Sequence, residues 1–145
     1  MEEREQKCIL VIEDNTAFLK MLKMRLESNG YRTLVSQNGL EGLNLVRREK
    51  PDLIICDLIL PGLDGHKITR MIKFDKSMQH IPIIMLTSRD LDEDMKLAKK
   101  CGADAFVIKT EKSEVLMDKI KELLEKGSSK SVIETVSFPE MQYVE

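Results

Sequence analysis

Residues 53–65 read LIICDLILPGLDG, and this stretch decides the fold. Its first four residues, 53–56, form a continuous apolar run of the kind found in a strand that is buried on both faces. A single carboxylate, Asp57, follows that run, and Pro61 and Gly62 then end the extended segment. A strand that is apolar on both faces indicates a parallel sheet, because helices cover both sides of such sheets.

The same alternation of apolar runs and helical patterns extends along the chain in both directions. The expected strands cover 8–12, 31–36, 53–56, 83–86 and 105–108. The expected helices cover 15–29, a segment that carries Leu40, Leu43 and Val46, and then 65–75, 91–101 and 111–126. In the third helix we expect Ile68, Met71 and Ile72 to face inward, and the more polar strand 31–36 to lie at an edge. Alternating strands and helices predict an α/β fold with a parallel sheet and helices on both faces.

The bulk composition argues against several classes of protein. At 145 residues the chain has the length of one domain, and 42% hydrophobic with 33% charged residues is the balance of a globular protein. The net charge of −2 and the lack of a basic cluster interleaved with aromatic residues argue against direct nucleic-acid binding. The N-terminus MEEREQK is charged, no apolar run reaches membrane-spanning length, and the three cysteines form no CxxC pair. We therefore expect a cytoplasmic protein without membrane contact.

The end of the chain differs in character from the rest. We expect residues 1–126 to form one domain and residues 127–145 to form a C-terminal tail or linker, because GSSK has the composition of a flexible linker. Residues 132–138 have β-type composition. The tail therefore has two interpretations: it is disordered, or it docks as an added strand or binds a partner.

Reactive side chains follow four of the five expected strands. They are Glu13 and Asp14 after the first strand, Asp57 after the third, Thr87 at the end of the fourth and Lys109 after the fifth. Each has an ordinary interpretation by itself, as a helix cap or a surface lysine. In parallel α/β sheets, however, functional groups gather at the carboxyl ends of the strands. We therefore expect these side chains to lie in one crevice.

The chemistry of this set indicates phosphoryl transfer. Three carboxylates in one crevice repel each other unless they bind protons or a cation. An oxygen-rich site of this kind suits Mg²⁺, which recruits phosphate oxygens as further ligands. An aspartate such as Asp57 acts as a nucleophile toward phosphorus and forms an acyl phosphate. The Lys109 ammonium would neutralise charge on the transferred group, and the Thr87 hydroxyl would bond one of its oxygens.

The strand-end pattern, ED, then D with LPGLDG, then TS, then K, resembles that of the CheY-like receiver domain of two-component response regulators. The resemblance covers about residues 7–126, nearly the whole chain. It implies a flavodoxin-like (βα)5 doubly wound fold with the strand order 2-1-3-4-5. It also implies that Asp57 accepts a phosphoryl group from a histidine kinase or a histidine phosphotransfer protein.

The same resemblance implies further roles for residues of this chain. The Mg²⁺ ligands would be Glu13, Asp14, Asp57 and the backbone carbonyl of Ile59, the switch pair would be Thr87 and Phe106, and Lys109 would be the lysine of the family. Phosphorylation would draw Thr87 inward, and Phe106 would rotate into the vacated space. The face formed by residues 91–101, 105–108 and 111–126 would then change shape and control a downstream protein. The protein would be a phosphoacceptor that assists its own phosphorylation and dephosphorylation, not an enzyme acting on an external substrate.

Three positions depart from the family pattern or vary within it. Many receivers have a proline in a cis bond after the lysine, but Thr110 stands here, so we expect a trans bond. Ile59 and Arg89 occupy positions that in the family tune how fast the phosphate is lost. Because the apolar Ile59 side chain would shield the acyl phosphate from water, we predict slow self-dephosphorylation.

Other interpretations stay open at the level of the sequence. A haloacid-dehalogenase-type phosphatase also uses a strand-end aspartate, but it needs a second aspartate two residues later, where this chain has Ile59. A flavodoxin-like binding module would need a phosphate loop rich in Gly, Ser and Thr after the first strand, where EDNTAF stands. A degenerate receiver that acts by protein contact alone is an alternative to a phosphorylated one. The chain could also be the receiver part of a longer protein whose output domain is absent, rather than a single-domain switch.

Overall fold

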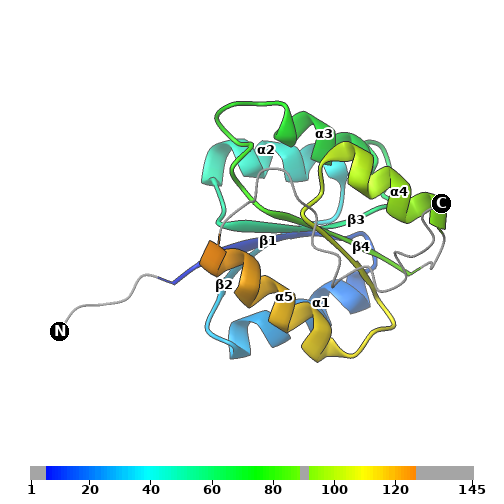
Figure 1. Ribbon diagram of the computed structural model, residues 1–145. Helices are drawn as coiled ribbons and strands as arrows, with labels where there is room; N and C mark the ends of the chain where they lie inside the picture. Colours follow the sequence, from blue (N-terminus) through cyan, green and yellow to red (C-terminus); the bar gives the residue numbers. More distant parts are fainter. Residues whose placement is uncertain (1–5, 89–91, 127–145) are drawn as a thin grey trace.

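The structure, a computed structural model, describes residues 6–88 and 92–126. Within these residues five strands alternate with five helices along the chain. Figure 1 shows how these elements are arranged. The strands are β1 (Cys8–Ile12), β2 (Arg32–Ser36), β3 (Leu53–Asp57), β4 (Ile83–Thr87) and β5 (Ala105–Ile108). The helices are α1 (Thr16–Ser28), α2 (Gly39–Glu49), α3 (Gly65–Lys73), α4 (Asp92–Cys101) and α5 (Ser113–Lys126). The expected tail, residues 127–145, and the expected helical residue Leu91 lie outside the described residues.

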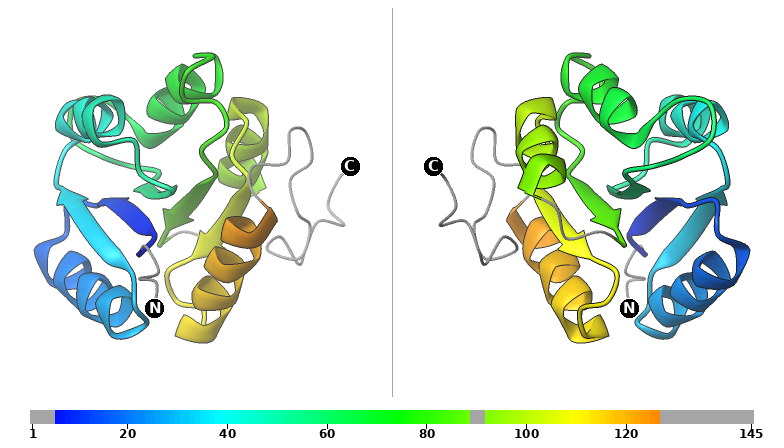
Figure 2. Two further views of the ribbon diagram at one scale, coloured as in Figure 1. Left: turned by 90° about the vertical axis from the view of Figure 1, so that its left-hand side faces the viewer. Right: turned by 90° about the vertical axis from the view of Figure 1, so that its right-hand side faces the viewer.

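These strands form one parallel sheet in the order β2-β1-β3-β4-β5, which confirms the predicted doubly wound α/β fold. The more polar strand β2 lies at an edge, as predicted. Figure 2 shows α1 and α5 on one face of the sheet and α2, α3 and α4 on the other. The connections run in opposite directions from β1 and β3, so the carboxyl ends of these two strands border the crevice in which such folds bind ligands.

Alternate residues of the central strands pack against opposite helical layers, which explains why these strands are apolar throughout. In β1, Leu10 and Ile12 belong to the core that includes α2, α3 and α4, whereas Ile9 and Val11 belong to the core that includes α1 and α5. All four side chains are fully buried. The polar groups at the strand ends therefore stand on a rigid support. Among the described helices, none is long and apolar enough to cross a membrane.

The third helix differs from its predicted orientation. Ile68 and Ile72 of α3 are buried as predicted, but Met71 is 43% exposed, so its predicted inward orientation is wrong. Thr69 takes the remaining inward position, because its hydroxyl donates to the Gly65 carbonyl oxygen at 2.9 Å and is satisfied without water. Met71 and Thr69 lie on opposite sides of the stripe formed by Ile68 and Ile72, and the helix buries the Thr69 side.

The second helix shows a smaller difference. Leu43 and Val46 of α2 are buried, whereas Leu40 in the first turn is 61% exposed. The preceding residue, Gly39, makes the close contact instead, because a Cβ at this position would collide with the Leu63 backbone. The start of α2 thus packs through a glycine against the loop between β3 and α3, and Leu40 turns toward solvent.

Candidate functional site

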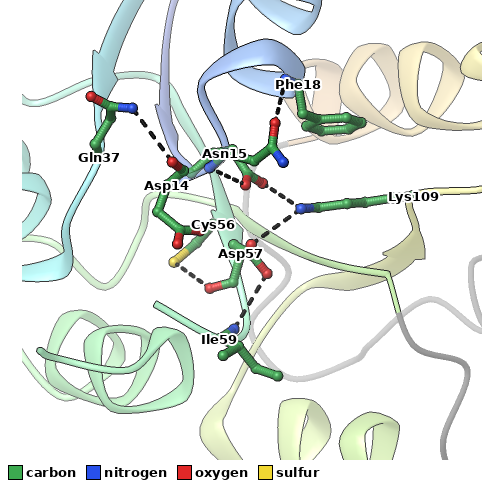
Figure 3. A network of polar contacts seen from close by, with 9 residues as sticks. Asp14, Asn15, Phe18, Gln37, Cys56, Asp57, Ile59 and Lys109 are labelled. Carbon is green, nitrogen blue, oxygen red and sulfur yellow. Dashed lines mark hydrogen bonds and ion pairs between the residues drawn. The ribbon is translucent and has the colours of Figure 1, made fainter. Parts of the chain in front are cut away.

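Neighbouring strands place the predicted acidic side chains at one edge of the sheet. The parallel register pairs Ile12 of β1 with Cys56 of β3, so the residues that follow these two emerge at the same level. Glu13 and Asp14 follow β1, and Asp57 is the last residue of β3. Figure 3 shows Asp14 and Asp57 side by side in this crevice. The sheet therefore brings together acids that are more than forty residues apart in the sequence.

Glu13, Asp14 and Asp57 form one acidic cluster. One carboxylate oxygen of each lies within 4.8 Å of the corresponding oxygens of the other two. Glu13 is 1% exposed and Asp57 is 7% exposed, whereas Asp14 lies on the surface. The backbone N–H of Asn15 donates to Glu13 Oε2 at 2.9 Å and holds this carboxylate in the loop. Three carboxylates at this spacing, with so little water around two of them, require a cation or protons nearby.

The protonation of Asp57 reflects this crowding. Burial, together with the negative charge of Glu13, raises the pKa of the Asp57 carboxyl group from 3.8 to about 6. The Lys109 ammonium and the backbone N–H of Ile59 oppose the shift, and the Ile59 N–H donates to Asp57 Oδ1 at 3.3 Å. Because ionisation of this group is unfavourable, any further cation that binds beside it stabilises the carboxylate.

Lys109 is the cation that the described structure brings into this cluster. Its Nζ lies 2.7 Å from Glu13 Oε1 and 3.2 Å from Asp57 Oδ2. Burial lowers the pKa of the ammonium, but the two carboxylates raise it more, so the net shift is upward and the group stays charged. The Lys109 backbone N–H donates to the Thr87 carbonyl oxygen at 2.6 Å. The described backbone contains no cis peptide bond, so the bond to Thr110 is trans, as predicted.

One ammonium leaves the cluster with an excess of negative charge. The donor atoms are carboxylate oxygens, which are the ligands that hard divalent cations prefer. Asp14 is exposed, so a cation reaches the cluster from solvent. The residues present therefore fit a hard divalent cation beside the Asp57 carboxylate.

The predicted switch residues lie on adjacent strands. Thr87 ends β4 and Phe106 lies in β5, and each is 1% exposed. Phe106 pairs with Met85 of β4 and belongs to the same core as the inner faces of α3 and α4. The sequence-based hypothesis has Phe106 rotating inward upon phosphorylation, but this side chain is already buried in the structure. Any rotation of the Phe106 side chain would therefore start from the buried position that it has in this structure.

The loop after β3 accounts for the second glycine of LPGLDG, Gly65. Gly65 passes so close to the Asp57 carbonyl that a Cβ at this position would collide with it, and the Gly65 N–H donates to the Leu58 carbonyl oxygen at 3.0 Å. This close approach holds the start of α3 against the end of β3. The Ile59 side chain is 52% exposed, and the other predicted tuning position, Arg89, lies outside the described residues.

Two residues near the cluster were not predicted from the sequence. Gln37 Nε2 donates to Thr16 Oγ1 at 2.9 Å and to the Asp14 carbonyl oxygen at 3.4 Å, and so ties the loop after β2 to the start of α1. Phe18 lies beside Lys109, with the lysine Nζ 4.7 Å from the centre of its ring. In the sequence, Phe18 belongs to the apolar stripe of the first helix and stands one helical turn after Asp14, but no local pattern indicates a contact with Lys109.

Comparison with known proteins identifies the family. Residues 9–121 match the sequence profile of the response regulator receiver domain, and the chain belongs to this family. The chain is 35% identical to the polar-differentiation response regulator DivK of Brucella anthropi, over 71% of this chain and 84% of DivK. It is 37% identical to the transcriptional regulatory protein AfsQ1 of Streptomyces coelicolor, over 85% of this chain but only 53% of AfsQ1, so it spans about half the length of that relative.

Solved structures agree with this assignment. The receiver domain of a signal transduction histidine kinase from Syntrophus aciditrophicus superimposes with a TM-score of 0.78 at 35% identity, over 87% of this chain and 94% of that domain. Receiver domains are signalling switches of two-component systems that interact with histidine kinases and downstream targets. The family that the strand-end pattern predicts is thereby confirmed, and the phosphatase and flavodoxin-like alternatives are rejected.

Proposed function

We propose that this protein is a phosphorylation-dependent switch in which Asp57 accepts a phosphoryl group from a histidine kinase or a histidine phosphotransfer protein, with Mg²⁺ as the cofactor. The observation that carries the proposal is the imbalance of charge around Asp57. The buried carboxylate is flanked by two further acids and a single lysine. Such a site gains stability from a divalent cation and from the phosphate oxygens that the cation recruits.

The residues of the site account for the transfer step. An Asp57 oxygen attacks the phosphorus atom, the bond from phosphorus to the donor's leaving group breaks, and an acyl phosphate forms. The Lys109 ammonium, 3.2 Å from Asp57 Oδ2, lies within reach of a phosphoryl oxygen and offsets its charge. Glu13, Asp14, Asp57 and the backbone carbonyl of Ile59 would hold Mg²⁺, which would supply further positive charge for the phosphoryl oxygens.

Phosphorylation is then transmitted to the surface formed by α4, β5 and α5. The Thr87 hydroxyl donates to a phosphoryl oxygen, and the altered position of Thr87 changes the balance between the inner and outer positions of Phe106. NMR spectra with and without acetyl phosphate test this step. We expect chemical-shift changes at Phe106 and along α4 and α5. Unchanged shifts at this surface in fully phosphorylated protein would rule the mechanism out.

The intact mass after incubation with acetyl phosphate and Mg²⁺ tests the function itself. We expect one phosphoryl adduct, which is absent in Asp57→Asn and absent when EDTA removes the metal. Asp64→Asn is the matched control, because it changes a nearby carboxylate that makes no capping hydrogen bond at the start of α3. It should retain the adduct. Absence of an adduct from the wild-type protein under all conditions would favour the degenerate receiver that acts by protein contact alone.

The lifetime of the acyl phosphate depends on the access of water. Ile59 carries an apolar side chain two residues after Asp57, and this side chain is 52% exposed. We propose that it covers the acyl phosphate and slows its hydrolysis. The rate of phosphate loss, followed by mass after removal of acetyl phosphate, should increase in Ile59→Asn. An unchanged rate would show that this side chain does not shield the group.

A further inference from the structure

The position of Lys109 requires a structural explanation. The residue after it is Thr110, in a trans bond, and not the proline of many receivers. The backbone N–H of Lys109 donates to the Thr87 carbonyl oxygen at 2.6 Å, and this hydrogen bond fixes the main chain at Lys109. This bond does not restrain the four-carbon side chain, which is flexible in lysine. The two carboxylates contact the ammonium only at its tip, so the direction of the side chain depends on what lies on its other side.

Phe18 occupies that other side. The Lys109 Nζ lies 4.7 Å from the centre of the Phe18 ring, within the range of a cation–π contact. Figure 3 shows the Lys109 side chain between Phe18 and the carboxylate of Asp57. Long side chains of a helix lean toward its N-terminus, so the ring of Phe18 in α1 leans back toward the end of β1 and the acids.

Phe18 lies in the first turn of α1 and packs against the core. The backbone N–H of Phe18 donates to Asn15 Oδ1 at 2.9 Å, which anchors the first turn of α1. The side chain is half-buried and packs against the core shared by α1 and α5. It also lines the groove between these helices, together with Leu22 and Leu116. The Phe18 ring therefore covers one side of the Lys109 ammonium, and the acids lie on its other side.

We propose that Phe18 is a positioning residue that holds the Lys109 ammonium at the phosphoacceptor through a cation–π contact. The proposal rests on the function proposed above, because Lys109 matters only if a phosphoryl group arrives at Asp57. In this proposal a residue of α1 restrains the Lys109 side chain. The loop after β5 has Thr110 and not a proline to shape it. The competing interpretation is that Phe18 only fills the core, in which case another apolar side chain of similar size serves equally well.

Two substitutions separate these interpretations. Phe18→Leu keeps an apolar side chain but removes the aromatic face, whereas Phe18→Tyr keeps the face. We expect the initial rate of adduct formation with acetyl phosphate and Mg²⁺ to fall about two- to fivefold in Phe18→Leu and to stay near the wild-type rate in Phe18→Tyr. Met21→Leu, a change on the same side of α1 that lines the same groove, should leave the rate unchanged.

A second readout does not depend on phosphorylation. Protons above an aromatic face resonate upfield, so the Lys109 Hε signals of the unphosphorylated protein should move downfield in Phe18→Leu and stay in place in Phe18→Tyr. The signals are assigned by their loss in Lys109→Arg. Unchanged Hε signals in Phe18→Leu would overturn the contact, and an unchanged rate in this variant would overturn the positioning role. Absence of any adduct in the wild-type protein would overturn the proposed function, and the Hε signals alone would then decide whether the contact exists.

Discussion

Two half-buried lysines lie at opposite ends of the same sheet, and their charge balances differ. Lys73, the last residue of α3, lies 2.8 Å from Asp104 Oδ2 just before β5. Its Nζ also donates to the carbonyl oxygens of Ile81 at 2.7 Å and Gln79 at 3.2 Å. Asp104 Oδ2 accepts a further hydrogen bond from the Ile83 N–H at 2.8 Å. This pair has one positive and one negative charge, and its polar atoms are bonded within the protein.

Lys109, at the other end of β5, contacts two carboxylates of a cluster of three. Burial, together with the negative charge of Glu13, raises the pKa of Asp57. Among the described residues, the group of three neighbouring acids is found here and not around Asp104. A buried pair that is matched and hydrogen-bonded stabilises a particular chain arrangement, and its loss leaves an unpaired charge. A buried cluster that is unmatched can gain a ligand. The comparison shows that charge balance, more than burial, distinguishes a structural ion pair from a candidate site.

The largest effect should come from breaking the matched pair. Asp104→Ala leaves the Lys73 ammonium without its carboxylate and the Ile83 N–H without its acceptor. We expect the free energy of unfolding to fall by about 3 kcal/mol. Chemical denaturation measures it, with the exposed Asp118→Ala as the control. A loss below about 1 kcal/mol would contradict the structural role. The molecules that remain folded should still form the phosphoryl adduct.

Removing a charge from the unmatched cluster should raise the free energy of unfolding instead of lowering it. Because the pKa of Asp57 is raised from 3.8 to about 6, the folded protein binds a proton here more readily than the unfolded chain does. The stabilising effect of this proton is present below pH 3.8 and is lost as the pH rises through 6. In EDTA, Asp57→Asn should therefore be more stable than wild type by about 1 to 2 kcal/mol at pH 7.5.

The pH dependence provides the control for this prediction. The stability difference between Asp57→Asn and wild type should shrink as the pH falls below 6 and vanish near pH 4, where the wild-type carboxyl group is itself neutral. Denaturation curves at several pH values measure it. A wild-type protein that is more stable than Asp57→Asn at pH 7.5 would show that the cluster is not short of positive charge.

A smaller effect should come from adding the missing cation. Mg²⁺ at ten times its dissociation constant should stabilise the wild-type protein by about 1.4 kcal/mol, because it binds only the folded state. Asp14→Asn should lose most of this gain, since it removes one carboxylate of the cluster, whereas Asp118→Asn should retain it. Equal stabilisation of Asp14→Asn and wild type by Mg²⁺, measured by thermal unfolding, would place the cation elsewhere.

The smallest effect should come from an ion pair that is neither buried nor crowded. Lys23 Nζ lies 3.1 Å from Glu27 Oε2 on the surface of α1, and the two side chains are 42% and 47% exposed. Lys23→Ala should change the free energy of unfolding by less than about 0.5 kcal/mol, and 1 M salt should remove the difference. A change as large as that of Asp104→Ala would show that burial does not determine how much an ion pair contributes to the free energy of unfolding.

The sequence predicts the strands, and the positions of the polar residues at their ends, because both signals are local. Each central strand is a short apolar run, and a polar residue that directly follows it must emerge at the carboxyl end of the sheet. Asp57 and Lys109 were predicted in this way, and the structure brings them within 3.2 Å of each other. The predicted orientation of Met71 was wrong. Apolar residues were expected to face inward, but Thr69 is buried instead, and its hydroxyl donates to the Gly65 carbonyl oxygen within the helix.

The contacts of Phe18 and Lys73 were not predictable in the same way. Phe18 belongs to an ordinary apolar stripe, and only the path of the chain after β5 brings Lys109 over its ring. Lys73 is one of many helical lysines, and its burial depends on the path of the chain between α3 and β4. Both contacts join segments that are far apart in sequence, so no local pattern encodes them.

The sequence by itself determined the order of strands and helices, the two-sided burial of the sheet and the set of reactive side chains at its edge. These follow from apolar periodicity and from the parallel direction of the strands, which are properties of short segments. Only the tertiary structure decided which charges are matched. The balance at Asp104 and the imbalance at Asp57 depend on distances of 2.8 Å and 3.2 Å between side chains from separate elements. Electrostatic energies change steeply over such distances, so the packed fold, and not the local sequence, sets them.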